Sequence, residues 1–246
     1  MTEPRDLVDE IERHVTLPEG HEERFSGYGI MGLPFASGHL LALRRFPASS
    51  LGAGYASVWH RDPQGRWTMF VDVPASRSCP RYFGSAVARA TELPIAIDWT
   101  GDRSFRVSID NGVDLRWSVS LGQPPVMKVL NAVGALMPDA LWRRPAVLRA
   151  MGSVASLTLG AGRLGLSGFA PNGQRFIANP LRMWSIVKSA ATLGGDDLGP
   201  LGKLSEQVHL GDFWIPQRGI FVIGRSFFEP FDSARHLAAT SQATDA

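Results

Sequence analysis

The sequence predicts a mainly β protein, either an antiparallel barrel or two packed β halves, on three observations. Runs of alternating apolar and polar residues recur along the chain, and such alternation is typical of strands with one buried face. Turn-forming Gly, Asn and Pro residues separate these runs, as they do in β-hairpins. The apolar share of 44% and the charged share of 20% are those of an ordinary globular protein, so the strands can enclose a core.

The clearest hairpin spans residues 103–121, where apolar residues alternate with polar ones on both sides of Asn111-Gly112. Asn-Gly between two alternating runs is a strong short-range hairpin signal. Turn sequences at 61–65 and 171–173 lie between further strand-like runs and predict two more hairpins. The sequence therefore predicts several antiparallel strand pairs spread over most of the chain.

Two segments have helical spacing instead. Residues 4–14 place Leu7 and Ile11 on one face, which predicts a short N-terminal helix. From about 125 to 152, apolar residues recur every three or four positions and prolines interrupt them, which predicts a short helical block. This block either divides two β halves or plugs one barrel.

These patterns set the expected organisation of the chain. We expect an N-terminal helix and linker at 1–26, a single β-rich domain at 27–232 and a flexible tail at 233–246. The expected parts of the domain are a β half at 27–122, a helical insert at 123–154 and a β half at 155–232.

Composition and charge argue against several classes of protein. The net charge of +2 is too small to indicate a nucleic-acid partner or attraction to an anionic membrane. The single cysteine, Cys79, excludes an internal disulfide and a cysteine-based zinc site. No run of about 18 apolar residues is present, so no transmembrane segment is expected. Since the polar N-terminus also lacks the apolar core of a signal peptide, we expect a cytoplasmic protein.

The sequence contains no motif of high specificity for a cofactor or a metal. Nucleotide-binding loops, nucleophile elbows and zinc-protease motifs are missing. No two of the six histidines lie at metal-ligand spacing. We therefore expect neither a bound cofactor nor a metal site.

The candidates for acid–base catalysis are His60, Asp72, Asp98 and Tyr82. His60 ends a predicted strand and could move protons at a barrel mouth, although the same segment suits a turn in which Asp62 accepts backbone hydrogen bonds. Asp72 and Asp98 lie in apolar strand contexts. An acid facing an apolar cavity there would have a raised pKa, whereas one that points to solvent or bonds a neighbouring strand would be structural.

The seven tryptophans are the most informative residues for binding. Six fall in strand-like segments, where large flat side chains either fill a core or line an apolar pocket, and the sequence leaves both interpretations open. Tyr82 could cap such a pocket, and the neighbouring Arg81 could clamp an acid group. The expected ligand-binding residues are Trp59, Trp67, Arg81, Trp99, Trp117, Trp184 and Trp214.

Two stretches of the chain carry a family resemblance: VWHRDPQGRWTMF, and GRLGLSGFAPNGQRF followed by RMWSIVKSA. In these stretches the chain resembles lipocalin-like bacterial proteins of the carotenoid-hydratase and AttH type, over roughly residues 35–225. The resemblance implies β-barrel halves that handle apolar, isoprenoid-like molecules. It assigns no catalytic residue to this sequence.

We therefore expect binding of an apolar, isoprenoid- or lipid-like small molecule in a β-barrel cavity. Chemistry there would be cofactor-independent acid–base isomerisation, hydration or cyclisation. Whether the protein is an enzyme stays open, as does its oligomeric state. The alternative is a non-enzymatic interaction protein that uses the apolar helical block at 125–152 as a partner or membrane-surface face.

Overall fold

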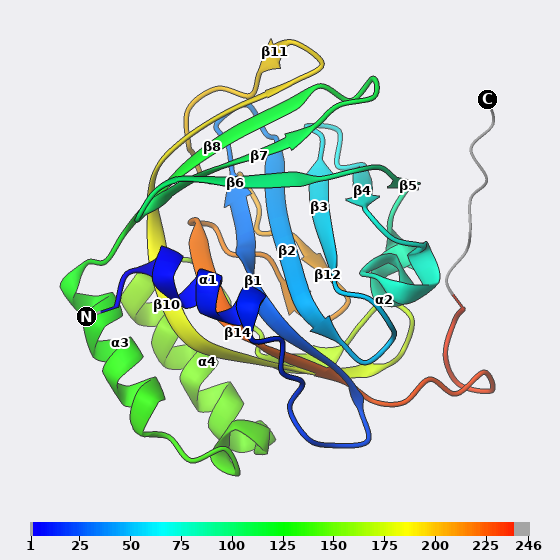
Figure 1. The fold of residues 1–246 in the computed structure, drawn as a ribbon, viewed down its shortest axis with the longest axis vertical. Helices are drawn as coiled ribbons and strands as arrows, with labels where there is room; N and C mark the ends of the chain where they lie inside the picture. The colour runs from blue at the N-terminus through cyan, green and yellow to red at the C-terminus, as the bar shows by residue number, and fades with distance from the viewer. Residues whose placement is uncertain (1, 239–246) are drawn as a thin grey trace.

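The computed structural model describes residues 2–238, and its main feature is one curled β-sheet. Twelve strands join this sheet and bend it into a half-barrel (Figure 1). The prediction of a mainly β protein is therefore confirmed. The strands of the sheet are β1 (Glu23–Pro34), β2 (Leu40–Ser49), β3 (Tyr55–Arg61), β4 (Trp67–Val71), β5 (Arg89–Glu92), β6 (Ala96–Gly101), β7 (Ser104–Ile109), β8 (Leu115–Gly122), β9 (Ser167–Phe169), β10 (Arg175–Leu193), β11 (Asp196–Asp197) and β14 (Ile220–Phe228).

The remaining elements pack around this sheet. A separate ribbon is formed by β12 (His209–Leu210) and β13 (Phe213–Trp214). The helices are α1 (Pro4–Arg13), α2 (Pro80–Phe83), α3 (Pro125–Leu136) and α4 (Pro145–Leu159), with single 3₁₀ turns at Ala75–Arg77, Gly84–Ala86 and Leu141–Arg143. The N-terminal helix and the helical block at 125–152 are therefore confirmed, and the second helix of the block extends to Leu159.

The order of the strands mixes the two ends of the chain. The sheet runs β5-β4-β3-β2-β1-β14-β10-β8-β7-β6, with antiparallel pairing along this path except between β4 and β5. The strands β14 and β10 come after the helical block, yet they lie between β1 and β8. Both β segments of the chain thus belong to one sheet. The three predicted hairpins are present as β3–β4, β7–β8 and β9–β10.

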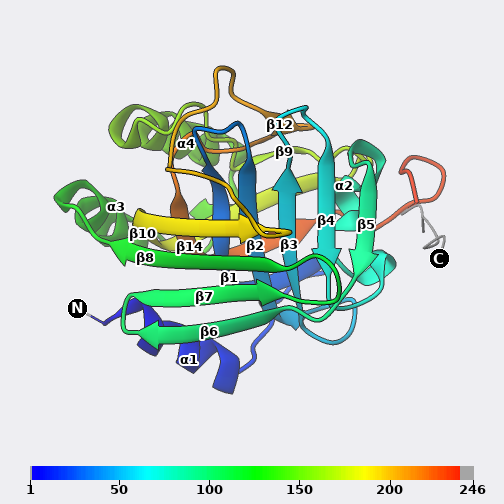
Figure 2. The same cartoon turned by 90° about the horizontal axis from the view of Figure 1, so that it is seen from above.

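The long strand β10 produces the curl of the sheet. Its first half pairs with β14 and its second half with β8. The pairing register shifts between Pro180 and Arg182 and again between Ile186 and Lys188. Such bulges bend a strand and increase its twist. As a result, β6, β7 and β8 cross in front of β1–β4 and form a second layer (Figure 2).

The inner face of the curl is filled by the protein's own side chains. An aromatic cluster joins the two layers: Phe221 of β14 lies 5.7 Å from Phe105, 5.9 Å from Trp184 and 6.1 Å from Trp99, measured between ring centroids. Helix α1 covers the open side and buries Val8 against this core. The interior of the half-barrel is therefore an ordinary hydrophobic core.

The outer face of β1–β4 is buried as well. Along β2, Leu41 and Leu43 point into the inner core, whereas Leu40 and Ala42 belong to a second core on the outside. This second core packs against α2 and the segments around β9, β12 and β13. The central strands are thus covered on both faces, which explains why β2 is buried at nearly every position.

Helices α3 and α4 lie side by side against the outside of the sheet (Figure 1). Each begins with a proline in its first turn, Pro125 and Pro145, where the missing N–H costs no helical hydrogen bond. Asn131 of α3 fastens this pair to β10: its Nδ2 donates to Met183 O at 2.9 Å, and its Oδ1 accepts from Met183 N at 2.8 Å.

The expected tail at 233–246 is described as far as residue 238, and residues 239–246 lie outside the described part of the chain. Within the described part of this segment, the ring of His236 is buried and its Nε2 lies 2.7 Å from Glu229 Oε1. Between residues 2 and 238, no helix is both long and apolar enough to cross a bilayer.

Candidate functional site

A cavity of about 420 Å³ lies between the α3–α4 pair and the outer face of β1, β10 and β14. This volume is within the range of roughly 300–1,000 Å³ in which proteins hold drug-sized ligands. Its walls are mostly apolar and include Leu130, Val133, Trp142, Met151, Val154 and Met183. The cavity is therefore on the opposite side of the sheet from the barrel interior in which a ligand was expected.

The floor of the cavity is formed by two glycines on adjacent strands. Gly27 of β1 and Gly224 of β14 are cross-strand partners, and both line the cavity. A Cβ atom at Gly27 would collide with Arg45 O, and one at Gly224 would collide with Asn179 O. Any other residue would distort this part of the sheet, so the floor is bare backbone. The missing side chains leave room beneath the helices.

One charged side chain, Arg44 of β2, is deeply buried beside the cavity and is only 5% exposed. Its Nη1 donates to Ile30 O at 2.5 Å and to Leu43 O at 2.8 Å, and its Nη2 donates to Met31 O at 3.3 Å. An arginine has five N–H donors. These hydrogen bonds therefore leave donor capacity for a further acceptor.

The charge of Arg44 has no carboxylate partner within residues 2–238. Instead its guanidinium lies over the ring of Trp59, at 4.7 Å from the centroid, and over that of Phe213, at 5.5 Å. Burial lowers the pKa of Arg44 to about 10, with smaller opposing effects from Cys79 and Tyr55. The side chain thus stays protonated at neutral pH as a buried, uncompensated cation.

A second polar group borders the same cavity without a partner. Asn179 of β10 is buried, and its Oδ1 accepts no hydrogen bond within the described chain. Leaving a buried polar atom unpaired costs about 1–3 kcal/mol. An unpaired buried group of this kind calls for an explanation. Because Asn179 lines a cavity, one explanation is a bound ligand that donates a hydrogen bond to its Oδ1.

A smaller cavity of about 40 Å³ continues behind Arg44. It is lined by Tyr55, Cys79 and Tyr82, among others. Burial raises the pKa of the Cys79 thiol and that of the Tyr55 phenol, although the Arg44 charge opposes both shifts. Both groups are therefore neutral at pH 7, and Cys79 is a packed thiol in the described structure.

A second groove of about 480 Å³ lies at the other end of the helices, between the start of α3, the end of α4 and residues 217–220. Its charged groups, Lys203 and Arg218, are exposed to solvent. Among residues 2–238, this groove has no buried charged group and no unpaired amide. We therefore place the candidate site in the cavity beside Arg44.

The tryptophans expected to bind ligand divide between the two faces of the sheet. Trp214 lines the 420 Å³ cavity, and Trp59 lines the smaller one. Trp67 packs in the outer core. Trp99, Trp117 and Trp184 pack in the core inside the curl. Trp142 lines the cavity wall but was not among the expected residues.

The four candidates for acid–base catalysis are not brought together. His60 and Asp72 lie at opposite ends of β3, because Asp72 Oδ1 accepts from Ala56 N at 2.7 Å. Burial raises the pKa of Asp72. Asp98 is exposed on β6, in the other layer of the sheet. Asp62 accepts from Arg66 N at 2.9 Å, which is the turn considered as the alternative for this segment.

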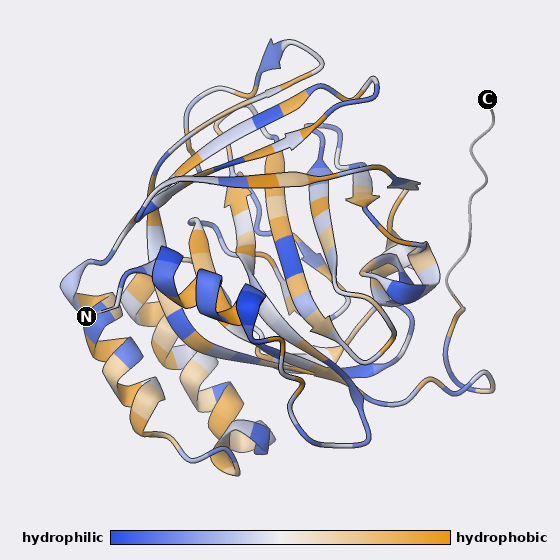
Figure 3. Ribbon diagram, viewed as in Figure 1, coloured by the Kyte–Doolittle hydropathy of each residue, from blue (hydrophilic) through white to orange (hydrophobic). Residues whose placement is uncertain are grey.

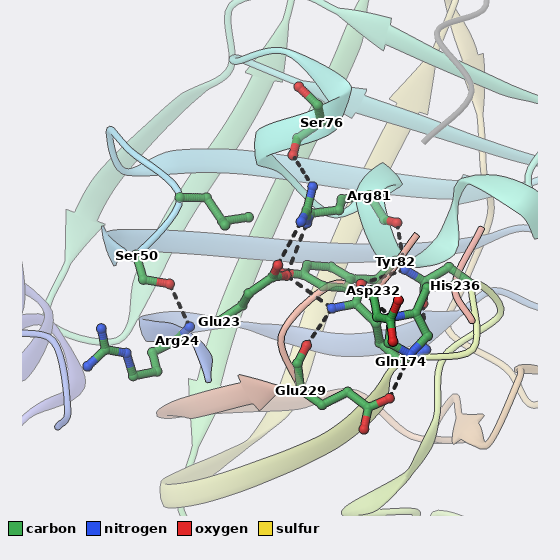
Figure 4. Close-up of polar contacts among 12 residues, drawn as sticks. Glu23, Arg24, Ser50, Ser76, Arg81, Tyr82, Gln174, Glu229, Asp232 and His236 are labelled. Carbon is green, nitrogen blue, oxygen red and sulfur yellow. Dashed lines mark hydrogen bonds and ion pairs between the residues drawn. The ribbon is translucent and has the colours of Figure 1, made fainter. Parts of the chain in front are cut away.

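Tyr82 and Arg81 take part in a polar network with Glu23 (Figure 4). Arg81 Nη2 donates to Glu23 Oε1 at 2.6 Å, and Tyr82 Oη donates to Glu23 Oε2 at 2.6 Å. Gln174 Nε2 donates to Glu23 Oε2 at 3.2 Å and to Glu229 O at 2.6 Å. The network ties α2, β1, the turn before β10 and the C-terminal segment together, and its members use their polar groups on one another.

Arg44 and Asn179 were not predicted from the sequence, although part of the signal was present. Arg44 and Arg45 are adjacent in a strand, so one of them must point to each face of the sheet. A charge on each face of an apolar strand requires a special environment on at least one side. The position of Asn179 beside the cavity depends on the pairing of β10 with β14, which no local pattern reveals.

No group of three or more His, Cys, Asp or Glu side chains in residues 2–238 is placed to hold a metal ion. No protein-family model matches this chain, and no curated protein matches its sequence. The resemblance to carotenoid-hydratase and AttH-type proteins finds no support in these comparisons. Among solved structures, an acetoacetate decarboxylase from Legionella pneumophila is similar over 92% of this chain and 90% of its own length, with a TM-score of 0.42 and 11% sequence identity.

Proposed function

We propose that this protein binds an apolar small molecule that carries a carboxylate, in the cavity between α3–α4 and the sheet. The apolar part of the ligand would fill the space under the helices. Its carboxylate would accept hydrogen bonds from Arg44. The observation that carries this proposal is the buried guanidinium of Arg44, which borders the cavity and has no carboxylate partner among residues 2–238.

Electrostatics supports an anionic head group. A buried charge without a counter-ion is costly, and an acid ligand would supply the missing counter-ion. Hydrogen bonds to charged groups contribute about 1.5–3 kcal/mol. The planar guanidinium also matches the geometry of a carboxylate. For a neutral ligand of the same shape, only the burial of its apolar surface would contribute to the free energy of binding.

Asn179 also lines this cavity, and its side-chain amide carries both donor and acceptor groups. Its unpaired Oδ1 could accept a hydrogen bond from a protonated acid or from a hydroxyl group on the ligand. We assign binding to this cavity and no chemical step, because His60, Asp72 and Asp98 do not line it.

The test uses dodecanoate as the probe and dodecanol as its uncharged match. Trp142 and Trp214 line the cavity, so binding should change the intrinsic tryptophan fluorescence. We expect dodecanoate to bind at least tenfold more tightly than dodecanol, since 1.4 kcal/mol corresponds to a factor of ten. Arg44→Met should remove this preference, whereas Arg44→Lys should keep part of it.

The matched control is Arg106→Met, which changes an exposed arginine of β7 in the other layer. It should bind dodecanoate as the wild type does. Circular dichroism and thermal unfolding establish that each variant is folded. Equal binding of dodecanoate by the wild type and by folded Arg44→Met would contradict the proposal.

A further inference from the structure

The α3–α4 pair exposes apolar side chains on the outside of the molecule. Val129, Val133 and Leu136 follow one another at helical spacing along α3, and Val154 and Leu157 do so on α4. Leu136 is 85% exposed and Leu157 is 87% exposed. We call these five residues the helical face. Figure 3 shows that apolar colouring predominates on both helices.

A set of exposed apolar residues on two neighbouring helices differs from single exposed residues, which are common on soluble proteins. Every member of the helical face is more than half exposed. The outward side of these helices is therefore not the polar side that a solvent-facing helix normally presents. A surface of this kind indicates an interaction.

Basic residues predominate in the segment that carries the helical face. Residues 125–165 contain five basic residues and a single acid, Asp139. Asp139 lies 3.5 Å from Arg225, outside this segment. The described residues give no ion pair to Lys128, Arg144 or Arg149. The overall net charge of +2 therefore conceals a local excess of positive charge, offset by acids elsewhere.

We propose that the helical face docks on the surface of a lipid bilayer that contains anionic headgroups. Apolar side chains flanked by Lys and Arg are what an interfacial helix needs: the apolar residues enter the headgroup region and the cations pair with lipid phosphates and carboxylates. The helices have 12 and 15 residues, which suits lying on a bilayer rather than crossing it.

The cavity gives a second reason to choose a bilayer. Val133 and Val154 belong to the helical face and also line the 420 Å³ cavity. The cavity and the exposed apolar surface are thus continuous at these two residues, one from each helix. On a docked protein, an apolar molecule would pass between the bilayer and the cavity without entering bulk water.

The docking itself does not rest on the ligand proposed above, because it involves neither Arg44 nor Asn179. The experiment measures co-sedimentation of the full chain with vesicles of phosphatidylcholine alone and with vesicles that also contain phosphatidylserine. We expect clear binding to the second kind and at least tenfold weaker binding to the first. Added salt should weaken the binding, because it screens exposed charges.

Two double variants test the two parts of the surface. Arg144→Gln with Arg149→Gln should weaken binding to anionic vesicles by about fivefold for each arginine removed. Leu136→Ser with Leu157→Ser should weaken binding at least tenfold. Since all four residues are exposed, these variants should fold like the wild type, which circular dichroism would establish.

The control variants lie away from the helices. Leu237→Ser removes an exposed apolar residue near the described C-terminal end, and Arg66→Gln with Arg89→Gln removes two exposed arginines near β4 and β5. Both should bind anionic vesicles as the wild type does.

Three results would overturn the proposal. The first is that the protein binds neither kind of vesicle, and the second is that the control variants lose as much binding as the test variants. The third is that the protein forms a dimer in solution without vesicles and that the double variant Leu136→Ser with Leu157→Ser is a monomer. The last result would mean that a second copy of the chain covers the helical face. Arg44→Met should still sediment with anionic vesicles, so failure of dodecanoate binding and failure of docking are separate outcomes.

Discussion

His60 makes the stability of this protein depend on pH. It is buried on β3, and its Nε2 lies 2.9 Å from His39 Nδ1. Burial lowers the pKa of His60 from 6.5 to about 4; the nearby His39 adds to this effect and Asp62 opposes it. The imidazole is therefore neutral at physiological pH in the folded protein.

The sign and the size of the effect follow from this pKa. Below pH 6.5 the unfolded chain binds a proton at this side chain that the folded protein does not bind. The free energy of unfolding therefore falls as the pH drops from about 6.5 to about 4. Each pKa unit is worth 1.36 kcal/mol. At pH 5, about 1.5 units below the unfolded pKa, the loss from this group is about 2 kcal/mol.

The measurement is urea unfolding at pH 7 and at pH 5, monitored by tryptophan fluorescence. Carboxylates also titrate in this range, so the change in the free energy of unfolding is compared between the wild type and variants. From pH 7 to pH 5, this free energy should fall by about 2 kcal/mol more in the wild type than in His60→Gln. His14→Gln, which changes an exposed histidine, should behave as the wild type. If the wild type and His60→Gln lose equal stability, the folded protein does not hold this imidazole neutral, and the reasoning fails.

Four further predictions concern the cavity and its surroundings. Asn179→Leu removes an unpaired buried oxygen, so the free energy of unfolding measured in urea should rise by about 1 kcal/mol. Dodecanoate binding should weaken in the same variant. A fall in the free energy of unfolding would mean that the amide is already hydrogen-bonded. Ala178→Phe should reduce dodecanoate affinity at least tenfold in a fluorescence titration, because the ring would occupy part of the cavity; unchanged affinity would place the ligand elsewhere. Glu23→Gln should lower the free energy of unfolding by about 3 kcal/mol, since it leaves the Arg81 charge without its partner; a change below about 1 kcal/mol would show that the network contributes little. Cys79 should react with a thiol reagent only as fast as the protein opens, because the thiol is buried and its pKa is raised; rapid reaction in the native protein would contradict this.

The fold could be predicted from the sequence where the information is local. The hairpin β7–β8 has alternating side chains and a turn at residues 110–114 in which Asn111 and Gly112 have positive φ angles of 58° and 85°. Asn and Gly adopt such angles at little cost. The helical block was predictable for the same reason, since its spacing and its prolines lie within the block itself. Both features depend on neighbours in the sequence.

The site could not be predicted in this way. Trp59 and Trp117 both lie in alternating strands, yet one packs in the outer core and the other in the inner core. Which face of a strand turns toward a helix pair depends on strand order. In particular, β14 lies between β1 and β10, and this places Gly224 opposite Gly27 under the helices. No window of the sequence contains both glycines.

Stability and binding oppose each other at the floor of this cavity. A leucine in place of Asn179 would fill similar space without an unpaired oxygen, and an uncharged side chain at Arg44 would avoid the desolvation that lowers its pKa to about 10. Both polar groups therefore carry a desolvation cost in the folded protein. Groups that break the rules of core packing are expected where a protein acts on something else. Because both border one apolar cavity, a ligand with an apolar body and an acidic head would compensate both costs at once.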